Sequence, residues 1–317
     1  MKKRWLLIGF VAVLLVLLVG AVFAQEKQKL YFIFVPKLVH PWYEDVIDGI
    51  KKAESLLEAT GMYDIEWEWL APQEADVVEH VRKIETAISK KPNGLAVAVL
   101  DPGSDVPAIQ EALKMGIPTI CFDTDAPESG RIGFVGRVDY IADGKEMAEI
   151  LAKAINYEGE VGILIGSPTA PNHRDRVAGF KEALSKYPNI KIVAELADND
   201  DLEKAIRLTE SMLAAHPNLK GIYGCNATAP IGAARAVKDA GKSGQVIVVG
   251  MDDLPEMVEF VRDGTVLAMS VQRVKEIGFW STIYLWALNT GHHIPDKHDT
   301  GSFVVYKEDL DVYTQWK

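Results

Sequence analysis

The chain has 317 residues, of which 48% are hydrophobic, and its 45 acidic residues outnumber its 34 basic residues, so the net charge is −11 at pH 7. A chain of this length is more than one modest hydrophobic core usually serves, so two domains are expected. The acidic balance leaves no basic stripe that could neutralise phosphates, which argues against nucleic acid as a partner.

The first residues predict an export signal. Three basic residues precede an uncharged apolar run over residues 5–24, which ends in the small residues Val22 and Ala24. This order is typical of a secretory signal peptide over residues 1–24 that is cleaved near Ala24. The apolar run is also just long enough to span a bilayer, so an uncleaved membrane anchor is the alternative.

From residue 29 onward, short β-branched segments alternate with longer segments whose apolar residues recur every three or four positions. The expected strands cover residues 30–35, 64–70, 94–99, 119–122, 160–165, 190–196, 221–224, 245–249 and 267–271. The expected helices cover residues 43–58, 77–89, 106–114, 142–155, 176–186, 202–215 and 231–240. This alternation is typical of parallel sheets covered by helices. Because the units divide evenly around Asp125, the sequence predicts two α/β lobes, each a doubly wound parallel sheet.

Polar side chains recur directly after the expected strands, where doubly wound sheets bind their ligands. Asp123 and Thr124 follow one strand, and Asn226, Asp252 and Gln272 stand at the ends of three others. Each Asp or Asn could instead cap a following helix. Together these residues suit a neutral polyol, because hydroxyl groups both donate and accept hydrogen bonds.

Two further pairs of residues could contribute to such a site. Trp42 and Tyr43 open the first expected helix and would offer an apolar face to ring C–H groups, although they could also pack beneath a loop. Arg174 and Arg176 follow the strand at 160–165, and their planar guanidinium groups can span two adjacent hydroxyls. The turn before Trp42 contains no glycine, which argues against a dinucleotide site.

The sequence offers no clear catalytic or metal motif. A Gly-x-Ser-x-Gly turn is absent, and neither Cys121 nor Cys225 stands beside a plausible base. His292, His293 and His298 lack a clear carboxylate or thiol partner for a metal ion. We therefore expect a protein that is not an enzyme and uses no cofactor or metal, although paired carboxylates could still act as acid and base. The two cysteines fall in different expected lobes, which predicts buried thiols rather than a disulfide.

Two suggestive short runs have simpler interpretations. The acidic run over residues 198–201 lacks the glycine and distal glutamate of a calcium loop. It is expected to supply an N-cap and first-turn acids to the helix over residues 202–215. The triplet Gly241-Lys242-Ser243 lacks the earlier glycine of a phosphate-binding loop and is expected to end a helix.

Six stretches carry a resemblance that covers most of the chain: HPWYEDVIDGIKKAE (40–54), GIPTICFDTD (116–125), RVAGFKEAL (176–184), HPNLKGIYGCNATAPIGAARAVKDAGK (216–242), VIVVGMDDLPE (246–256) and AMSVQRVKEIG (268–278). In these stretches the chain resembles the ribose-type periplasmic sugar-binding proteins of bacterial ABC transporters, which have the type 1 periplasmic-binding fold. The resemblance implies a periplasmic monomer that delivers a sugar to membrane permease subunits. It also implies three crossover strands at a hinge, with an N-terminal lobe of residues 25–138 plus 273–301 and a C-terminal lobe of residues 139–272 plus 302–317.

The resemblance also implies a ligand shell, formed by His40, Trp42, Tyr43, Asp123, Thr124, Arg176, Asn199, Asn226, Asp252 and Gln272. Asp139, at a lobe boundary, and Arg174 are further candidate ligand-binding residues. The chain departs from the family at three positions: His40 stands where asparagine is usual, Thr124 where ribose binders have arginine, and Asn199 where a second aromatic normally closes the other ring face. The expected ligand is therefore a pentose, a hexose or a cyclic polyol such as myo-inositol.

A second branch of the family is similar in other places. FVPKLV (34–39) and SPT (167–169) resemble the autoinducer-2 and rhamnose-type binders, in which the lysine after the first strand reaches the ligand. This resemblance adds Lys37 to the candidate ligand-binding residues. An autoinducer-2 or rhamnose-type binding protein is therefore one alternative, and a sugar sensor for a chemoreceptor or sensor kinase is another.

Overall fold

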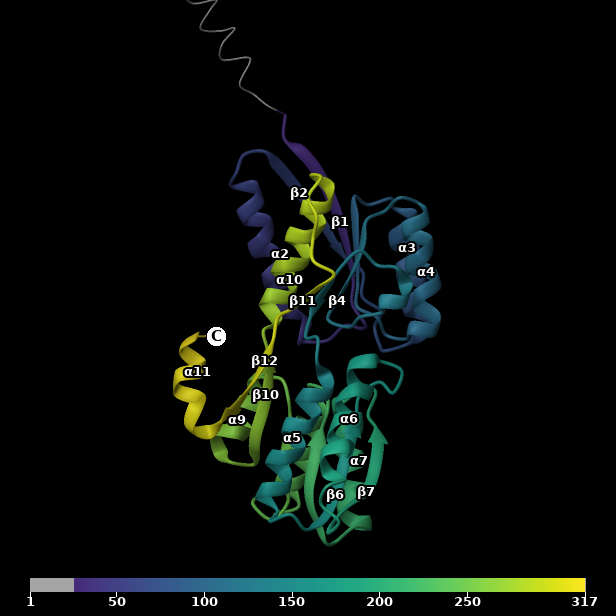
Figure 1. The fold of residues 1–317 in the computed structure, drawn as a ribbon. Helices are drawn as coiled ribbons and strands as arrows, with labels where there is room; N and C mark the ends of the chain where they lie inside the picture. Colours follow the sequence, from purple (N-terminus) through teal and green to yellow (C-terminus); the bar gives the residue numbers. More distant parts are fainter. Residues whose placement is uncertain (1–25, 317) are drawn as a thin grey trace, which may run out of the picture.

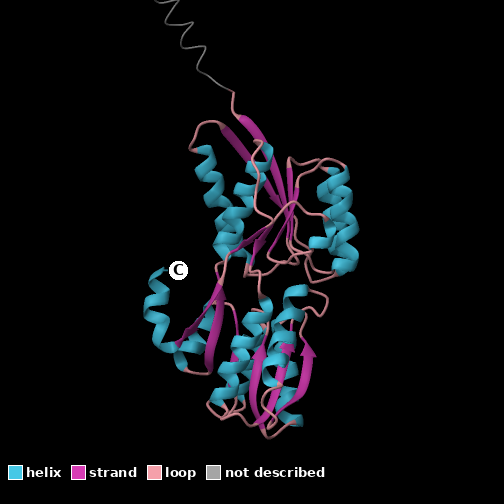
Figure 2. Ribbon diagram, viewed as in Figure 1, coloured by secondary structure: helices cyan, strands magenta, loops and turns pink. Residues whose placement is uncertain are grey.

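A computed structural model describes residues 26–316, which form two α/β lobes, drawn one above the other in Figure 1. The expected signal peptide over residues 1–24 lies outside the described residues. No helix within residues 26–316 combines the length and the apolar character needed to cross a bilayer. The fold class expected from the sequence is confirmed: two sheets of six strands are each covered by helices on both faces (Figure 2).

The first sheet has the strand order β11-β5-β4-β3-β1-β2, and all of its neighbouring strands are parallel. Its strands are β1 (Gln28–Val35), β2 (Tyr63–Trp69), β3 (Gly94–Val97), β4 (Thr119–Phe122), β5 (Phe134–Gly136) and β11 (Lys297–Asp299). Helices α2 (Tyr43–Glu58) and α10 (Val274–Asn289) cover one face, and helices α3 (Val77–Ser89) and α4 (Pro102–Lys114) cover the other (Figure 1).

The second sheet repeats this order as β12-β10-β9-β8-β6-β7. Its strands are β6 (Gly159–Ile165), β7 (Ile190–Ala197), β8 (Leu219–Gly224), β9 (Ile247–Met251), β10 (Val266–Gln272) and β12 (Ser302–Tyr306). Its helices are α5 (Tyr140–Ala154), α6 (Pro171–Leu184), α7 (Leu202–Ala215), α8 (Ala229–Asp239), α9 (Pro255–Asp263) and α11 (Leu310–Trp316). One detail differs from a wholly parallel sheet, because β12 returns at the edge antiparallel to β10.

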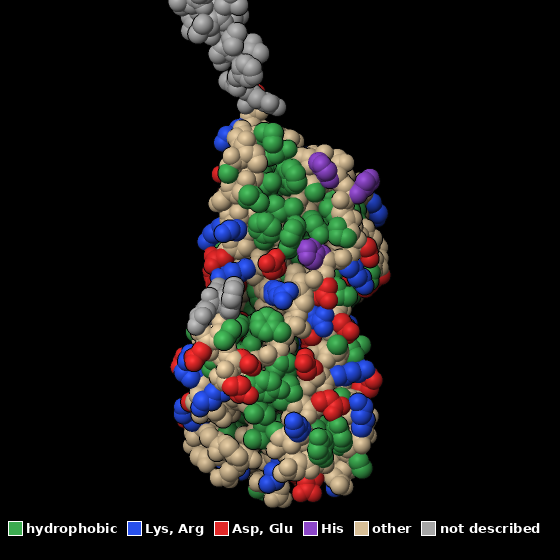
Figure 3. All heavy atoms as spheres, turned by 60° about the vertical axis from the view of Figure 1, so that its left-hand side comes forward, with side chains coloured by type: hydrophobic (Ala, Val, Ile, Leu, Met, Phe, Trp, Pro, Cys, Tyr) green, Lys and Arg blue, Asp and Glu red, His purple; other side chains and the backbone are tan. Residues whose placement is uncertain are grey.

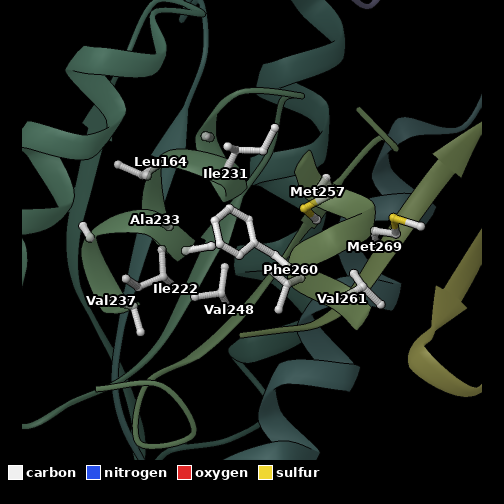
Figure 4. Close-up of a cluster of buried hydrophobic side chains, with 14 of the residues drawn as sticks. Leu164, Ile222, Ile231, Ala233, Val237, Val248, Met257, Phe260, Val261 and Met269 are labelled. Carbon is white, nitrogen blue, oxygen red and sulfur yellow. The ribbon is translucent and has the colours of Figure 1, made fainter. Parts of the chain in front are cut away.

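Each face of each sheet buries its own hydrophobic cluster. Figure 4 shows the cluster beneath α8 and α9, where Phe260 and Met257 pack near Ile222 and Val248 of the second sheet. Burial of this kind is the main favourable contribution to folding. Both sheets are therefore held from two sides, which fixes the ends of their strands as a frame for side chains.

In each lobe, one pair of helices packs at unusually close range through glycines. A Cβ added at Gly49 of α2 would lie 2.0 Å from the carbonyl oxygen of Lys275, and one at Gly278 of α10 would lie 1.9 Å from that of Val46. In the second lobe, a Cβ at Gly144 of α5 would lie 1.9 Å from the carbonyl oxygen of Arg176. Only glycine permits these backbone contacts, so the sequence fixes the position of α6 against α5.

The chain passes between the sheets three times: after β5, after β10 and after β11. Arg137 joins two of these passages, because its guanidinium pairs with Asp143 of α5 and with Asp299 of β11, each at 2.9 Å. The backbone N–H of Val138 also donates to Asp299. The passages after β5 and after β11 are thus bonded to each other between the lobes.

The periodic pattern located most elements well. Helices α2, α3 and α7 have the expected bounds, whereas α4 and α6 begin earlier, each at a proline. Strand β9 lies two residues later than expected, so that it ends directly before Asp252. The sequence did not predict β5, β11, β12, α9, α10 or α11. Cys121 and Cys225 are both buried free thiols, as expected.

Candidate functional site

The carboxyl ends of the strands from both sheets meet at one cavity, which encloses about 340 Å³ of empty space, including the part that opens to solvent. From the first lobe it is lined by Lys37, Leu38, His40, Trp42, Tyr43 and Asp123. From the second lobe it is lined by Asn172, His173, Arg176, Asp200, Asn226, Ala227, Asp252 and Gln272. Strand order in both sheets reverses direction beside the first strand of the lobe, which is where such sheets bind ligands.

Asp123 organises the wall of the first lobe. It follows β4 directly and has a φ of +58°, a left-handed backbone that non-glycine residues rarely adopt. Its carboxylate lies 3.1 Å from Lys37 Nζ and accepts a hydrogen bond of 2.8 Å from the hydroxyl of Tyr43. Lys37 Nζ also donates to Thr124 Oγ1 at 3.2 Å and, across the gap between the lobes, to Asn172 Oδ1 at 3.4 Å. The buried charges of this wall are therefore paired.

Asp252 has the corresponding place in the second lobe. It follows β9 directly with a φ of +66°. Its Oδ1 accepts hydrogen bonds from Gln272 Nε2 at 2.8 Å and from the indole N–H of Trp42 at 3.0 Å. Burial raises the pKa of Asp252 to about 6, although the nearby Arg176 opposes this shift.

Arg176 lies fully inside the second lobe, with 1% of its surface exposed. Its Nη1 donates to the carbonyl oxygen of Cys225 at 3.2 Å, and its guanidinium lies over the ring of Tyr140. Burial alone would lower its pKa, but Asp252 and Asp143 hold the pKa above its usual value. Nε and Nη2 have no partner among the residues that the structure describes, so two buried donors of one planar group remain available.

The amides of Asn226 and Gln272 are held so that their oxygens remain unbonded. Asn226 Nδ2 donates to Asp200 Oδ1 at 2.8 Å, to Thr228 Oγ1 at 3.0 Å and to Asp198 Oδ1 at 3.2 Å. Gln272 Nε2 donates to Asp252. Within residues 26–316, Asn226 Oδ1 and Gln272 Oε1 are buried without a donor. Both residues line the cavity and can offer it acceptors.

Two histidines in the cavity are held neutral with defined tautomers. His40 Nδ1 accepts a hydrogen bond from the backbone N–H of Trp42 at 3.1 Å, and His173 Nδ1 accepts one from that of Ser167 at 2.9 Å. In a neutral ring the proton then resides on Nε2. Burial lowers the pKa of His40, and it lowers the pKa of His173 to about 4. Both Nε2 atoms are therefore donors at neutral pH.

The acidic run at the end of β7 is more than a helix cap. Asp201 is the N-cap of α7, as expected, and accepts a hydrogen bond from the backbone N–H of Lys204. Asp198 and Asp200, however, turn inward, and both contact Asn226. Burial raises the pKa of Asp198 well above its usual value. The expectation that these acids serve only the first turn of the helix was wrong.

The structure brings most of the expected site residues together: Lys37, His40, Trp42, Tyr43, Asp123, Arg176, Asn226, Asp252 and Gln272 all line the cavity. Thr124 is buried behind Lys37 and supports it. The remaining three, Asn199, Asp139 and Arg174, are exposed and do not line it. Asp139 instead caps α5 by accepting a hydrogen bond from the backbone N–H of Ala142.

Sequence reasoning missed Leu38, Asn172, His173, Asp200 and Ala227. Helical spacing could have indicated Asn172, which lies four residues before Arg176 on the same face of α6. Across residues 26–316, no group of three or more His, Cys, Asp or Glu side chains is arranged to hold a metal ion.

Comparisons with known proteins agree with this geometry. A family model described as a periplasmic binding protein domain matches residues 31–292. The chain is 31% identical over 287 residues to the D-ribose/D-allose-binding protein of Pseudomonas aeruginosa, covering 87% of this chain and 88% of that protein. It is 30% identical over 255 residues to the D-allose-binding periplasmic protein of Escherichia coli, covering 78% and 80%. The crystal structure of an ABC transporter solute-binding protein from Burkholderia graminis, in complex with D-arabinose, superposes with a TM-score of 0.83 at 32% identity and covers 90% of this chain and 97% of that chain.

Proposed function

We propose a function for this chain, which belongs to the periplasmic binding protein family. It captures a neutral sugar or cyclic polyol between its two lobes and delivers it to an ABC transporter. Three of its relatives are named as binding proteins for ribose, allose, xylose or arabinose, which supports this class of ligand. We further propose that it is exported by a signal peptide cleaved near Ala24, acts in the periplasm as a monomer and releases its ligand chemically unchanged.

One observation carries the proposal: five buried polar atoms without a partner among the described residues belong to side chains that line one cavity. Three are donors, His40 Nε2 and the Nε and Nη2 of Arg176, and two are acceptors, Asn226 Oδ1 and Gln272 Oε1. A buried polar atom left unbonded costs about 1–3 kcal/mol. Hydroxyl groups both donate and accept, so a polyhydroxylated ligand can satisfy the whole set.

The charges of the cavity favour a neutral ligand. Lys37 is paired with Asp123, and Arg176 lies near Asp252. A carboxylate or phosphate on the ligand would therefore find no uncompensated cation in the cavity. It would also lose its hydration on entering a buried space, which is costly for a charge.

The connection between the lobes supports capture by closure. We propose that residues 25–138 plus 273–301 move as one lobe and residues 139–272 plus 302–317 as the other, with the bonded passages around Arg137 as the hinge. Hinge closure around a ligand is characteristic of this class of protein. The ligand would bind the closed form more tightly because only that form presents donors and acceptors from both walls.

The charges on the surface agree with a protein that works away from nucleic acid. On the face that Figure 3 shows, acidic and basic side chains interleave over the lower lobe and along the edges of the upper lobe, and they do not gather into a basic stripe. Such a stripe is what phosphate recognition requires.

A thermal-shift screen tests the proposal. The panel contains D-ribose, D-allose, D-arabinose, D-xylose, D-fucose and myo-inositol, and a ligand at one hundred times its Kd adds about 2.7 kcal/mol to the unfolding free energy. We expect at least one compound to raise the Tm of the natural protein and of Arg174→Ala, whose side chain is exposed, but not of Arg176→Ala. If no compound raises the Tm of the natural protein, the proposed function is wrong.

A further inference from the structure

The two walls of the cavity differ in chemistry. The wall of the first lobe places the apolar and aromatic side chains Leu38, Trp42 and Tyr43 beside the polar Lys37, His40 and Asp123. The wall of the second lobe is mainly polar, and its lining side chains are amide, imidazole, guanidinium and carboxylate groups, with Ala227 as the exception. A ring bound between them would therefore pack a C–H face on the aromatic part of the first wall, with Lys37 and His40 beside it, and turn its projecting hydroxyls toward the second wall.

Asp200 enters the polar wall through an unusual turn. Asn199 and Asp200 are consecutive non-glycine residues with left-handed backbones, at φ values of +59° and +60°. The turn is fixed by hydrogen bonds from the backbone N–H of Asp200 to Asp198 Oδ1 and from that of Asn199 to the carbonyl oxygen of Gly166. Its result is that Asn199 faces solvent, whereas the side chain of Asp200 is 9% exposed and lines the cavity. Such strained backbone is held where it serves a site.

The carboxylate of Asp200 is an ionised acceptor. Its Oδ1 accepts from Asn226 Nδ2, and its Oδ2 lies 4.0 Å from His173 Nδ1. That imidazole nitrogen already accepts a hydrogen bond from Ser167, so it does not donate to Asp200. Burial alone would raise the pKa of Asp200, but the charge of Lys37, joined by those of His173 and His40 in the acidic range where the imidazoles are protonated, holds it below its usual value. An ionised acceptor makes stronger hydrogen bonds to hydroxyls than a neutral one does.

We infer that Asp200 determines the stereochemical selectivity of the cavity by accepting a hydrogen bond from a ligand hydroxyl that projects out of the ring plane toward the second lobe. In a pyranose chair this is an axial hydroxyl, because equatorial hydroxyls lie near the ring plane. The substrate class is then a neutral sugar or cyclitol with one C–H face and an axial hydroxyl on the other face. The inference rests on the proposed function and deepens it.

Epimer pairs test the inference, because the two members of a pair differ only in the orientation of one hydroxyl. Suitable pairs are D-allose with D-glucose, D-galactose with D-glucose, D-mannose with D-glucose, and D-ribose with D-xylose. For at least one pair, calorimetry should give the natural protein a preference of tenfold or more for the axial epimer. Asp200→Asn keeps the size of the side chain and should weaken the axial epimer by about 10- to 100-fold, as loss of a hydrogen bond to a charged group does. It should weaken the equatorial epimer by about threefold or less.

Two controls separate selectivity from damage to the fold. Asn199→Gly alters the exposed neighbour in the same turn, keeps the left-handed backbone and should leave both affinities unchanged. The deoxy analogue of the preferred sugar, which lacks only the axial hydroxyl, should bind the natural protein and Asp200→Asn about equally well. Equal weakening of both epimers by Asp200→Asn, or no weakening, would overturn the inference alone. If a compound of the thermal-shift panel binds but no sugar of these pairs does, the inference fails alone. If no compound of either set binds the natural protein, the proposed function fails and the inference fails with it.

Discussion

The indole N–H of Trp42 donates a hydrogen bond to Asp252 Oδ1 at 3.0 Å, although Trp42 precedes the first helix of one lobe and Asp252 follows a strand of the other. Only 8% of the surface of Trp42 is exposed. This contact ties the apolar wall of the cavity to its polar wall. It also orients Asp252, which holds the amide of Gln272.

Trp42→Phe should weaken sugar binding because it keeps an aromatic face but removes the N–H donor. The loss of one hydrogen bond to a charged group predicts a decrease of about tenfold in affinity, or about 1.4 kcal/mol. Calorimetry with the tightest ligand from the screen measures it. Trp280→Phe is the matched control, since its indole N–H donates to Glu276 on α10, outside the cavity. Equal affinities for Trp42→Phe and the natural protein would contradict the role given to this contact.

The protonation of Asp252 should make stability depend on pH. Its pKa is about 6 in the folded chain and 3.8 in the reference state, so the folded state binds its proton more tightly. Its contribution to the unfolding free energy is therefore fully present below pH 3.8 and is lost as the pH rises through 6, by an amount on the order of 3 kcal/mol. Denaturant unfolding without sugar should show the natural protein losing stability relative to Asp252→Asn between pH 4 and pH 7. A constant difference between the two proteins would refute the shift.

The lobes also touch outside the ligand cavity, and this contact should favour closure. Thr169 Oγ1 donates to the carbonyl oxygen of Leu100 in the first lobe at 3.1 Å and lies 2.9 Å from Ser167 Oγ. Asp105 fixes the turn at Leu100, because its Oδ2 accepts a hydrogen bond from the backbone N–H of Leu100.

Thr169→Val keeps the shape of the side chain but removes this hydrogen bond, so the open form should become more populated. Small-angle scattering without sugar should give a larger radius of gyration than for the natural protein, and sugar affinity should fall by about threefold to tenfold. Thr86→Val is the control, because Thr86 bonds only within its own helix, to the carbonyl oxygen of Arg82. An unchanged radius of gyration would exclude a closing role for Thr169.

Close packing of α5 on α6 should link the stability of the second lobe to its binding site. Gly144→Ala would place a Cβ 1.9 Å from the carbonyl oxygen of Arg176 and so displace the helix that carries the guanidinium. We expect a loss of about 3 kcal/mol in unfolding free energy, at the upper end for overpacking, together with weaker sugar binding.

Two glycine controls separate these effects. Gly94→Ala would place a Cβ 2.9 Å from the side chain of Leu285 at the amino end of β3, away from the cavity, so it should reduce stability and leave the affinity of the folded protein nearly unchanged. Gly103→Ala meets only the far end of the Asp101 side chain, at 3.4 Å, and should change stability by about 1 kcal/mol or less. If Gly144→Ala binds sugar as well as Gly94→Ala does, the link to Arg176 is absent.

The elements that the sequence predicted well are those whose pattern reflects burial against a single neighbour. Helix α7 has one apolar face, and its bounds were found correctly. Strands β5 and β11 have three residues each, and β11 forms only by pairing with β5, while β5 pairs with β4 and β11, so no local pattern marks them. Helix α10 carries aromatic and aliphatic residues on several sides, which hides its period.

The site residues show the same limit on a smaller scale. Asp123 and Asp252 could be predicted because each directly follows a buried strand and so lies at the carboxyl edge of its sheet, where ligands bind. Arg174 and Arg176 could not be separated by sequence alone, since only the position of α6 decides which of them faces the cavity. The sequence pointed to Asn199, whereas Asp200 lines the cavity, because two consecutive residues with left-handed backbones form the turn. The spacing of residues does not reveal such a turn.

A crystal structure of the complex with the tightest sugar from the screen tests the central claim most directly. The account predicts one sugar molecule in the cavity, within hydrogen-bond distance of Lys37 or His40 on one lobe and of Arg176 and Asn226 on the other. A sugar bound at any other place, or one that contacts a single lobe in the closed molecule, would contradict it.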